Sequence, residues 1–190
     1  MLVSPHGSNE LKPLLLSSPE VEQAKERAND FVCKIEMTSR ELSDLLMLGM
    51  GAYTPLNGFM GYKDWLGVCK EMKTTTGVFW PIPITLSVSE EVANNIKIGD
   101  EVALIDNLGR LYGQVTAHEI YQIDRVMECS AVFGTEDTNH PGVAKVMNQH
   151  AYNLGGPVKV FDEGDYPKKY KGLYMRPAET RSLFQSNGWS

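Results

Sequence analysis

Hydrophobic residues in the first part of the chain recur with the period of a helix. Ser18 and Pro19 are typical of a helix start, as an N-cap and a first helical residue. A second start is expected at Thr38, because its spacing to Glu41 matches a capping box and leucines follow three and four residues apart. Two glycines near residue 50 then permit a left-handed exit. These helices, with a third one, are predicted to cover residues 18–29, 38–49 and 62–72.

β-branched and aromatic residues replace this pattern from residue 78 onward. Pro81 and Pro83 confine the first of these segments to an edge or bulged strand. The strongest strand signal is at residues 98–106, and a glycine-containing loop then leads into a return strand. A glycine pair and Pro157 are expected to break the chain before the last strand. With two short early strands included, the predicted strands are residues 14–16, 31–36, 78–86, 98–106, 111–120, one within 121–133, and 158–161.

Two further helices are expected after residue 138, with a charged stretch between them. A short helix begins near Pro141, because a polar, turn-forming segment precedes it. Residues 165–172 are interpreted as a linker, since they are charged and broken by a proline. A new helix is predicted from Pro177, with Leu183 and Phe184 on its apolar face and a glycine after its end.

Strands joined by short hairpins, with helices concentrated early, predict an α+β fold. Its centre is expected to be a small closed or half-closed β-barrel with flanking helices. Alternating strand–helix–strand units are absent from the sequence, so a nucleotide-binding parallel sheet is not expected in this stretch. We predict one domain over residues 1–168, and the linker and first helix of a second domain over residues 169–190.

Composition narrows the classes of partner. The formal net charge is −6 and the pI is about 5.2, which argues against a broad nucleic-acid surface. The basic cluster of Lys168, Lys169 and Lys171 is interpreted as part of a solvated linker. Three widely spaced cysteines and the absence of a signal-peptide pattern or a long apolar run favour a cytoplasmic protein without a membrane segment.

Motifs that carry catalysis on their own are missing. The sequence contains no phosphate-binding GxxxxGK[ST], no GxGxxG after a strand and no GxSxG. The four histidines form no HxxH or HExxH pair, and the cysteines form no CxxC pair. We therefore expect no catalytic, substrate-binding or metal-binding residue in this chain.

Two segments are candidates for the edge of a site or for packing. Phe59 and Met60 belong to an aromatic, glycine-containing loop, which can line a site or fill the core. Asp137 and His140 belong to a polar cluster before a helix, which can bind an ion or a partner loop. The same cluster can consist of turn and capping residues that hydrogen-bond locally. Packing and local hydrogen bonding are the interpretations we favour.

Six blocks of sequence, spread over the chain in order, resemble ATP sulfurylase (sulfate adenylyltransferase). They are residues 7–14 (GSNELKPL), 53–60 (YTPLNGFM), 80–86 (WPIPITL), 137–143 (DTNHPGV), 155–158 (GGPV), and 176–184 (RPAETRSLF) with Gly188 and Trp189. One block would be weak support, but six in the order of the family are specific.

The resemblance implies a PUA-like β-barrel followed by a Rossmann-like catalytic domain, truncated here after its first helix. The family joins sulfate to the α-phosphate of ATP with magnesium, forming adenylyl sulfate and pyrophosphate. Its Q-x-R-N-x-x-H-x-x-H and G-R-D-H motifs are absent from this sequence. ATP and Mg²⁺ are therefore expected to bind the complete nucleotidyltransferase and not this chain.

The role expected from the resemblance is that of a scaffold for sulfate activation. Its partner would be the catalytic domain of the same enzyme, with contacts between copies in a homo-oligomer. The alternative is a free-standing PUA-like RNA-binding module, and the acidic charge argues against it.

Overall fold

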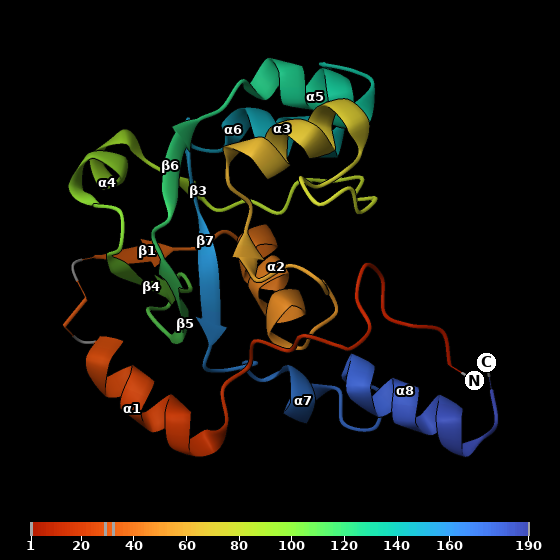
Figure 1. The fold of residues 1–190 in the computed structure, drawn as a ribbon. Helices are drawn as coiled ribbons and strands as arrows, with labels where there is room; N and C mark the ends of the chain where they lie inside the picture. Colours follow the sequence, from red (N-terminus) through yellow and green to blue (C-terminus); the bar gives the residue numbers. More distant parts are fainter. Residues whose placement is uncertain (1, 29, 32, 190) are drawn as a thin grey trace. The chain divides into compact units, whose positions relative to one another are not determined.

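The computed structural model describes residues 2–28, 30–31 and 33–189 (Figure 1). The chain forms two compact units, which we call unit 1 and unit 2. Unit 1 comprises Met1–Gly58, Glu101–Val115 and Val158–Ser190, and unit 2 comprises Phe59–Asp100 and Thr116–Pro157. Each unit is therefore discontinuous in sequence. The division into domains at residue 168 stays a prediction.

Unit 1 contains four helices of the described chain, three strands and the C-terminal end of a fourth strand, β7 (Tyr152–Val160). Its elements are α1 (Ser18–Ala28), β1 (Lys34–Glu36), α2 (Ser39–Gly49), β4 (Glu101–Ile105), β5 (Leu111–Thr116), α7 (Tyr166–Lys169) and α8 (Pro177–Ser186). β1 pairs in parallel with β4, and β5 lies next to β4 in the sheet. The C-terminal end of β7 pairs antiparallel with β5, with Gly113 opposite Val160.

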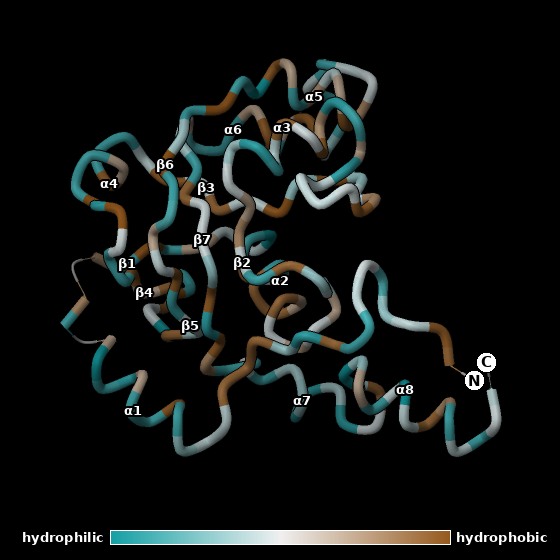
Figure 2. Tube along the Cα trace, viewed as in Figure 1, coloured by the Kyte–Doolittle hydropathy of each residue, from teal (hydrophilic) through white to brown (hydrophobic). Residues whose placement is uncertain are grey.

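Local sequence explains where the helices of unit 1 begin. Thr38 and Glu41 form the expected capping box, in which Thr38 N–H donates to the Glu41 carboxylate at 2.8 Å. α1 buries Val21 and Ala24 in a cluster with Phe161, while most of its surface is polar (Figure 2). An apolar stripe on a polar helix is what a helix packed on one face of a core requires.

Unit 2 contains the other helices, arranged with three short strands. Its elements are α3 (Tyr62–Glu71), β3 (Ser87–Val88), α4 (Glu90–Asn95), β6 (Glu119–Gln122), α5 (Arg125–Phe133) and α6 (Pro141–Asn148), while β2 (Gly58–Phe59) crosses from unit 1. The N-terminal part of β7 pairs antiparallel with both β3 and β6.

Two small clusters of buried side chains hold the helices of unit 2 together. In the first, Trp65 and Cys69 of α3 pack with Tyr121 and Ile123. In the second, Cys129 of α5 packs with two valines of α6, Val143 and Val146. The short helix predicted to begin near Pro141 is thus confirmed as α6.

Several other predictions are confirmed. The helices predicted over residues 38–49 and 62–72 correspond to α2 and α3, and the helix predicted from Pro177 is α8. The strong strand signal at residues 98–106 corresponds to β4. The first helix runs from Ser18 to Ala28, and its predicted last residue, Asn29, lies outside the described residues.

The segment 121–133 was predicted to contain a strand, and this is largely wrong. β6 ends at Gln122, and residues 125–133 form α5. Asp124 is the N-cap and accepts a hydrogen bond from Met127 N at 3.0 Å. The helix is stabilised by this cap and by packing on α6, so tertiary contacts override the apolar, β-branched pattern.

The predicted break at the glycine pair is also wrong. β7 continues through Gly155, Gly156 and Pro157 as one nine-residue strand. A Cβ atom on Gly155 would lie 2.8 Å from the carbonyl oxygen of Met60, and one on Gly156 would overlap the carbonyl oxygen of Thr116. The glycines are therefore needed for close backbone approach and not for a turn.

The remaining differences involve short elements. Residues 78–86 form no continuous strand: Phe79 makes a single bridge with Lys73, and β3 begins only at Ser87. The return strand predicted to reach residue 120 is divided into β5 and β6. Of the strand predicted over residues 14–16, the structure has only a bridge from Leu15 to Val160. The strand predicted over residues 31–36 is shortened to β1, and its residue 32 lies outside the described residues. α4 was not predicted, and the expected linker at 165–172 contains α7.

No helix within the described residues combines the length and the apolar character that a membrane crossing demands.

Candidate functional site

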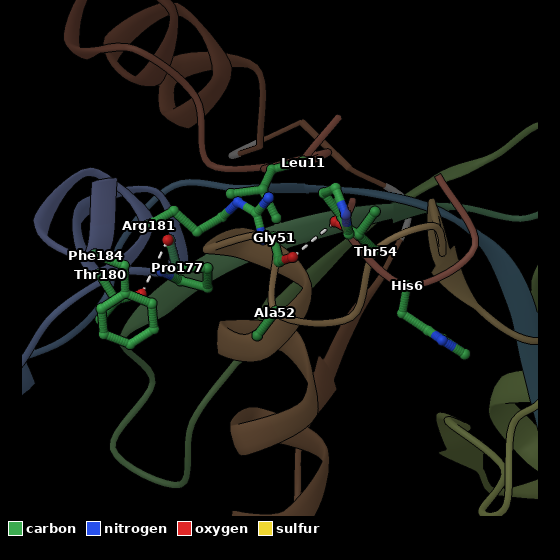
Figure 3. Close-up of a pocket in the computed structure, with 10 residues that line it drawn as sticks. His6, Leu11, Gly51, Ala52, Thr54, Pro177, Thr180, Arg181 and Phe184 are labelled. Atoms are coloured by element: carbon green, nitrogen blue, oxygen red, sulfur yellow. Dashed lines mark hydrogen bonds between the residues drawn. The ribbon is translucent and has the colours of Figure 1, made fainter. Parts of the chain in front are cut away.

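A pocket of about 350 Å³ opens on unit 1 (Figure 3). It is bounded by the N-terminal arm, the turn after α2 and the first turns of α8. Its lining residues are Pro5, His6, Leu11, Gly51, Ala52, Thr54, Pro177, Thr180, Arg181 and Phe184. The arm and α8 lie near opposite ends of the sequence, so folding creates this pocket from segments that no local motif connects.

The arm is fixed to the turn after α2 by hydrogen bonds. Lys12 N donates to Thr54 Oγ1 at 3.0 Å, and that hydroxyl donates to Gly51 O at 2.7 Å. Gly51 has a φ of 80° and lies close to the backbone of Pro13, so a side chain there would be strained and crowded. The floor of the pocket is thus built by the left-handed exit that the glycines near residue 50 predicted.

The wall formed by α8 is anchored at its N-terminus. Arg176 precedes the helix, and its guanidinium makes two hydrogen bonds to the buried carboxylate of Glu163. Tyr174 OH donates to the same carboxylate at 3.0 Å. These contacts raise the pKa of Arg176 above its ordinary value, chiefly through the hydrogen bonds to Glu163. Arg181, one turn along α8, donates from Nη2 to the carbonyl oxygen of Val3 at 2.5 Å.

The described lining of the pocket combines hydrogen-bonding groups with apolar side chains. Arg181 supplies a guanidinium and the threonines supply hydroxyl oxygens, against apolar walls of proline, leucine and phenylalanine. The described lining residues contain no cysteine, serine or carboxylate, and His6 supplies an imidazole. Across the described residues, no group of three or more His, Cys, Asp or Glu side chains is placed to hold a metal ion.

The two candidate residues of the glycine-containing loop are buried in unit 2. Phe59 and Met60 are each 3% exposed. Met60 is held by its backbone, since its N–H donates to Ile84 O at 2.9 Å and its carbonyl accepts from Tyr121 OH at 2.9 Å. Neither side chain lines the pocket of Figure 3.

Asp137 and His140 lie together at the start of α6, on the exposed surface of unit 2. His140 is the N-cap, and its Nδ1 accepts hydrogen bonds from Gly142 N and Val143 N at 3.2 and 3.4 Å. Its ring lies against Phe133, with centroids 5.1 Å apart. Among the described residues, no hydrogen bond joins this pair to Phe59 or Met60, so the four candidates do not form one cluster.

A buried polar network in unit 2 was not found by sequence reasoning. Trp65 Nε1 donates to Glu128 Oε2 at 2.6 Å, and Asn153 Nδ2 donates to Tyr121 OH at 3.4 Å. Burial raises the pKa of Tyr121 and raises that of the Cys69 thiol to about 12. Both groups are therefore neutral at physiological pH, which is typical of packing groups and not of nucleophiles. No motif or spacing in the sequence links these positions.

Another buried carboxylate of unit 1 lies on α2, the helix before the pocket floor. Asp44 of α2 accepts hydrogen bonds from Tyr53 OH at 3.1 Å and from Arg40 Nη1 at 3.2 Å. Burial raises the pKa of Asp44 to about 6, which outweighs the opposing effects of Arg40 and Tyr53. The same environment raises the pKa of Tyr53 to about 12.

Asp44→Asn is expected to stabilise the chain at pH 7.5 by ~2 kcal/mol and to have little effect at pH 4. Because the folded-state pKa of Asp44 exceeds its unfolded value, the protonated form favours folding, and this contribution is lost as pH rises from the ordinary aspartate pKa to about 6. Urea unfolding at both pH values measures the difference. The exposed Glu26→Gln variant is the control, and an equal gain from Asp44→Asn at both pH values would contradict the explanation.

Comparison with known proteins places these features in a family. Residues 3–163 match the model of the PUA-like domain. The chain is 53% identical over 191 aligned residues to a sulfate adenylyltransferase from Pelodictyon phaeoclathratiforme and 52% identical to that of Chlorobaculum tepidum. Each alignment covers 100% of this chain and 47% of the relative. The chain thus spans about half the length of the curated relatives it matches.

Solved structures with a similar fold include the following example. It is a hexameric APS kinase from Thiobacillus denitrificans, with a TM-score of 0.72 and 24% sequence identity. The match covers 100% of this chain and 32% of that chain. At this level of identity the likeness is one of fold, and it agrees with the expected α+β, PUA-like architecture.

Proposed function

Because the chain belongs to the PUA-like domain family and resembles sulfate adenylyltransferases along its whole length, we propose that it forms the N-terminal part of such an enzyme. The complete enzyme joins sulfate to the α-phosphate of ATP and releases pyrophosphate, or catalyses the reverse reaction. The observation that carries this proposal is the identity of 53% over the full chain with a relative about twice as long.

The part of the enzyme formed by this chain is a scaffold. Adenylyl transfer brings two anions together, so the reacting centre needs cationic and hydrogen-bonding groups around sulfate and the α-phosphate. Neither catalytic motif of the family occurs in the sequence. The single guanidinium of Arg181 in an open pocket is not a site for two anions. We infer that this chain makes no adenylyl sulfate by itself.

We propose that ATP and Mg²⁺ bind residues of the complete enzyme outside the 190 residues described by this sequence. The described residues offer no cluster of carboxylates for a metal ion, and the sequence has no glycine-rich phosphate loop. These residues do not fit either group, so no step of the reaction is assigned to them.

The proposed partner is the catalytic domain of the same enzyme, with α8 as the first helix of that Rossmann-like domain. Leu183 on α8 is 41% exposed and Trp189 after the helix is 56% exposed, although both are large apolar side chains. An apolar face of this kind is suited to packing against a further domain. Contacts between copies in a cytoplasmic homo-oligomer are part of the same proposal.

The test compares three proteins in a pyrophosphate-release assay with ATP, Mg²⁺ and sulfate. The 190-residue chain alone is expected to give no turnover above background. A chimera in which this chain replaces the matching part of the Chlorobaculum tepidum relative is expected to be active, with the intact relative as the positive control. Turnover by the chain alone, or a folded but inactive chimera, would refute the proposal.

The competing RNA-binding role predicts a different result. With a net charge of −6, the chain is expected to bind single-stranded and duplex RNA no better than bovine serum albumin at about 50 mM salt. Fluorescence anisotropy with labelled RNA measures this. Tight binding that weakens steeply with added salt would favour the RNA-binding module instead.

A further inference from the structure

The pocket of unit 1 differs in charge from the chain as a whole, which is acidic. Among its described lining residues, Arg181 and His6 are the ionisable side chains, and none is an aspartate or glutamate. The chain as a whole is acidic, with 24 Asp and Glu against 18 Lys and Arg. In an acidic protein, a cavity whose described lining contains an arginine and no carboxylate favours a ligand with negative charge.

Arg181 is held in place but keeps most of its hydrogen-bonding capacity. The guanidinium has five N–H donors, and one nitrogen, Nη2, donates to Val3 O at 2.5 Å. Within the described residues, no carboxylate forms an ion pair with it. Figure 3 shows the side chain reaching from α8 toward Leu11 and Gly51. The contact with the arm thus orients the guanidinium without neutralising its charge.

The hydroxyl groups of the lining already donate their protons within the protein. Thr54 Oγ1 donates to Gly51 O at 2.7 Å, and Thr180 Oγ1 donates to Pro177 O at 2.9 Å. The protons of these hydroxyls are therefore already used within the protein, so the charge-assisted hydrogen bonds to an anionic ligand would come from Arg181. The other walls are apolar side chains from the arm and from α8: Pro5, Leu11, Pro177 and Phe184.

We propose that this pocket binds a small organic oxyanion. Its carboxylate, or the charged oxygens of a phosphate or sulfate ester, would accept hydrogen bonds from Arg181, the geometry in which guanidinium recognition is strongest. Its apolar body would lie against Pro177 and Phe184. A volume of about 350 Å³ is at the lower end for small-molecule pockets, and it is large enough for a ligand such as benzoate or phenyl phosphate. The proposal does not depend on the proposed function.

The test is titration calorimetry of the 190-residue chain with benzoate, phenyl phosphate and the neutral benzamide. One or both anions are expected to bind with a Kd on the order of 1 mM, and benzamide at least ~10-fold more weakly. The two anions distinguish a carboxylate site from a phosphate-ester site. Failure of both to bind at ~10 mM, or equal binding of benzamide, would overturn the proposal.

Two variants locate the binding. Arg181→Met removes the charge and keeps most of the side-chain length, so anion binding should fall at least ~10-fold. Ala52→Phe fills the pocket and leaves Arg181 unchanged; Ala52 is exposed in a turn, so this variant should fold, and it should also abolish binding. Arg27→Met, at an exposed arginine outside the pocket, is the control and should bind normally. Anion binding retained in either pocket variant would place the site elsewhere and overturn the inference.

Discussion

Gly156→Ala is expected to destabilise the chain by about 3 kcal/mol or more, because the new methyl group would meet rigid backbone. A Cβ atom at this position would overlap Thr116 O and lie 3.2 Å from His118 N. Neither neighbour is a side chain that can rotate away. Relief requires β7 to separate from residues 116–118, where His118 N donates to Gly155 O at 3.0 Å.

Urea unfolding followed by far-UV circular dichroism measures this loss. Gly134→Ala in the same unit is the matched control, since Gly134 has a φ of 67° and open space around its Cα. Its cost should be about 1 kcal/mol, from the left-handed backbone alone. If the two alanine variants lose equal stability, steric exclusion at Gly156 is not the cause.

Trp65→Phe is expected to cost about 3–4 kcal/mol, because it removes buried volume and a hydrogen-bond donor together. Trp65 is 1% exposed and packs on Cys69 and Tyr121. Phenylalanine cannot donate to Glu128 Oε2, which accepts from the indole at 2.6 Å. A buried carboxylate that loses a charge-assisted hydrogen bond is strongly destabilising.

A double-mutant cycle separates the two contributions to this loss. Glu128→Gln is made alone and in the Trp65→Phe background, and thermal unfolding is measured for all four proteins. Glutamine should recover part of the loss in the Trp65→Phe background, since the removed indole donor then leaves a neutral amide and not a carboxylate at this position. Strict additivity of the two substitutions would show that lost packing volume explains the whole effect.

The parts of the fold that could be predicted from the sequence are those encoded within one turn of the chain. Thr38 and Glu41 cap α2 with atoms three residues apart, and Pro177 begins α8 because its fixed φ suits a first turn. All the residues that form such a signal lie close to one another in the sequence. Such signals do not depend on what the segment later packs against.

Most of the errors come from contacts between segments that are separated in sequence, and one of them also involves a local signal, the N-cap at Asp124. Residues 125–133 are apolar enough for a strand, but Asp124 and the packing on α6 select a helix. Gly155 and Gly156 are typical of a turn, but here they lie within one continuous strand. Because they have no side chains, the backbone of neighbouring segments can approach that strand closely. A single sequence does not show which segment will be the neighbour.

The candidate site was less predictable for the same reason. Arg181 belongs to a recognisable sequence block, but its pocket exists only because the arm carrying Val3 lies against α8. The candidates chosen from local pattern, Phe59 and His140 among them, occupy a core and a helix cap. Whether those positions also border the site of a complete enzyme stays a prediction.

The chain passes between unit 1 and unit 2 four times, which limits how the protein can be divided into separate fragments. Both chain termini belong to unit 1, so shortening the chain from either end removes unit 1 first. Unit 2 is interrupted only by residues 101–115, which form the β4–β5 hairpin. At the ends of that interruption, Ala117 N donates to Asp100 O at 2.9 Å and Gly99 N donates to Ala117 O at 2.7 Å. The hairpin is thus an insertion with adjoining ends, and a short loop could replace it to give unit 2 as a continuous polypeptide.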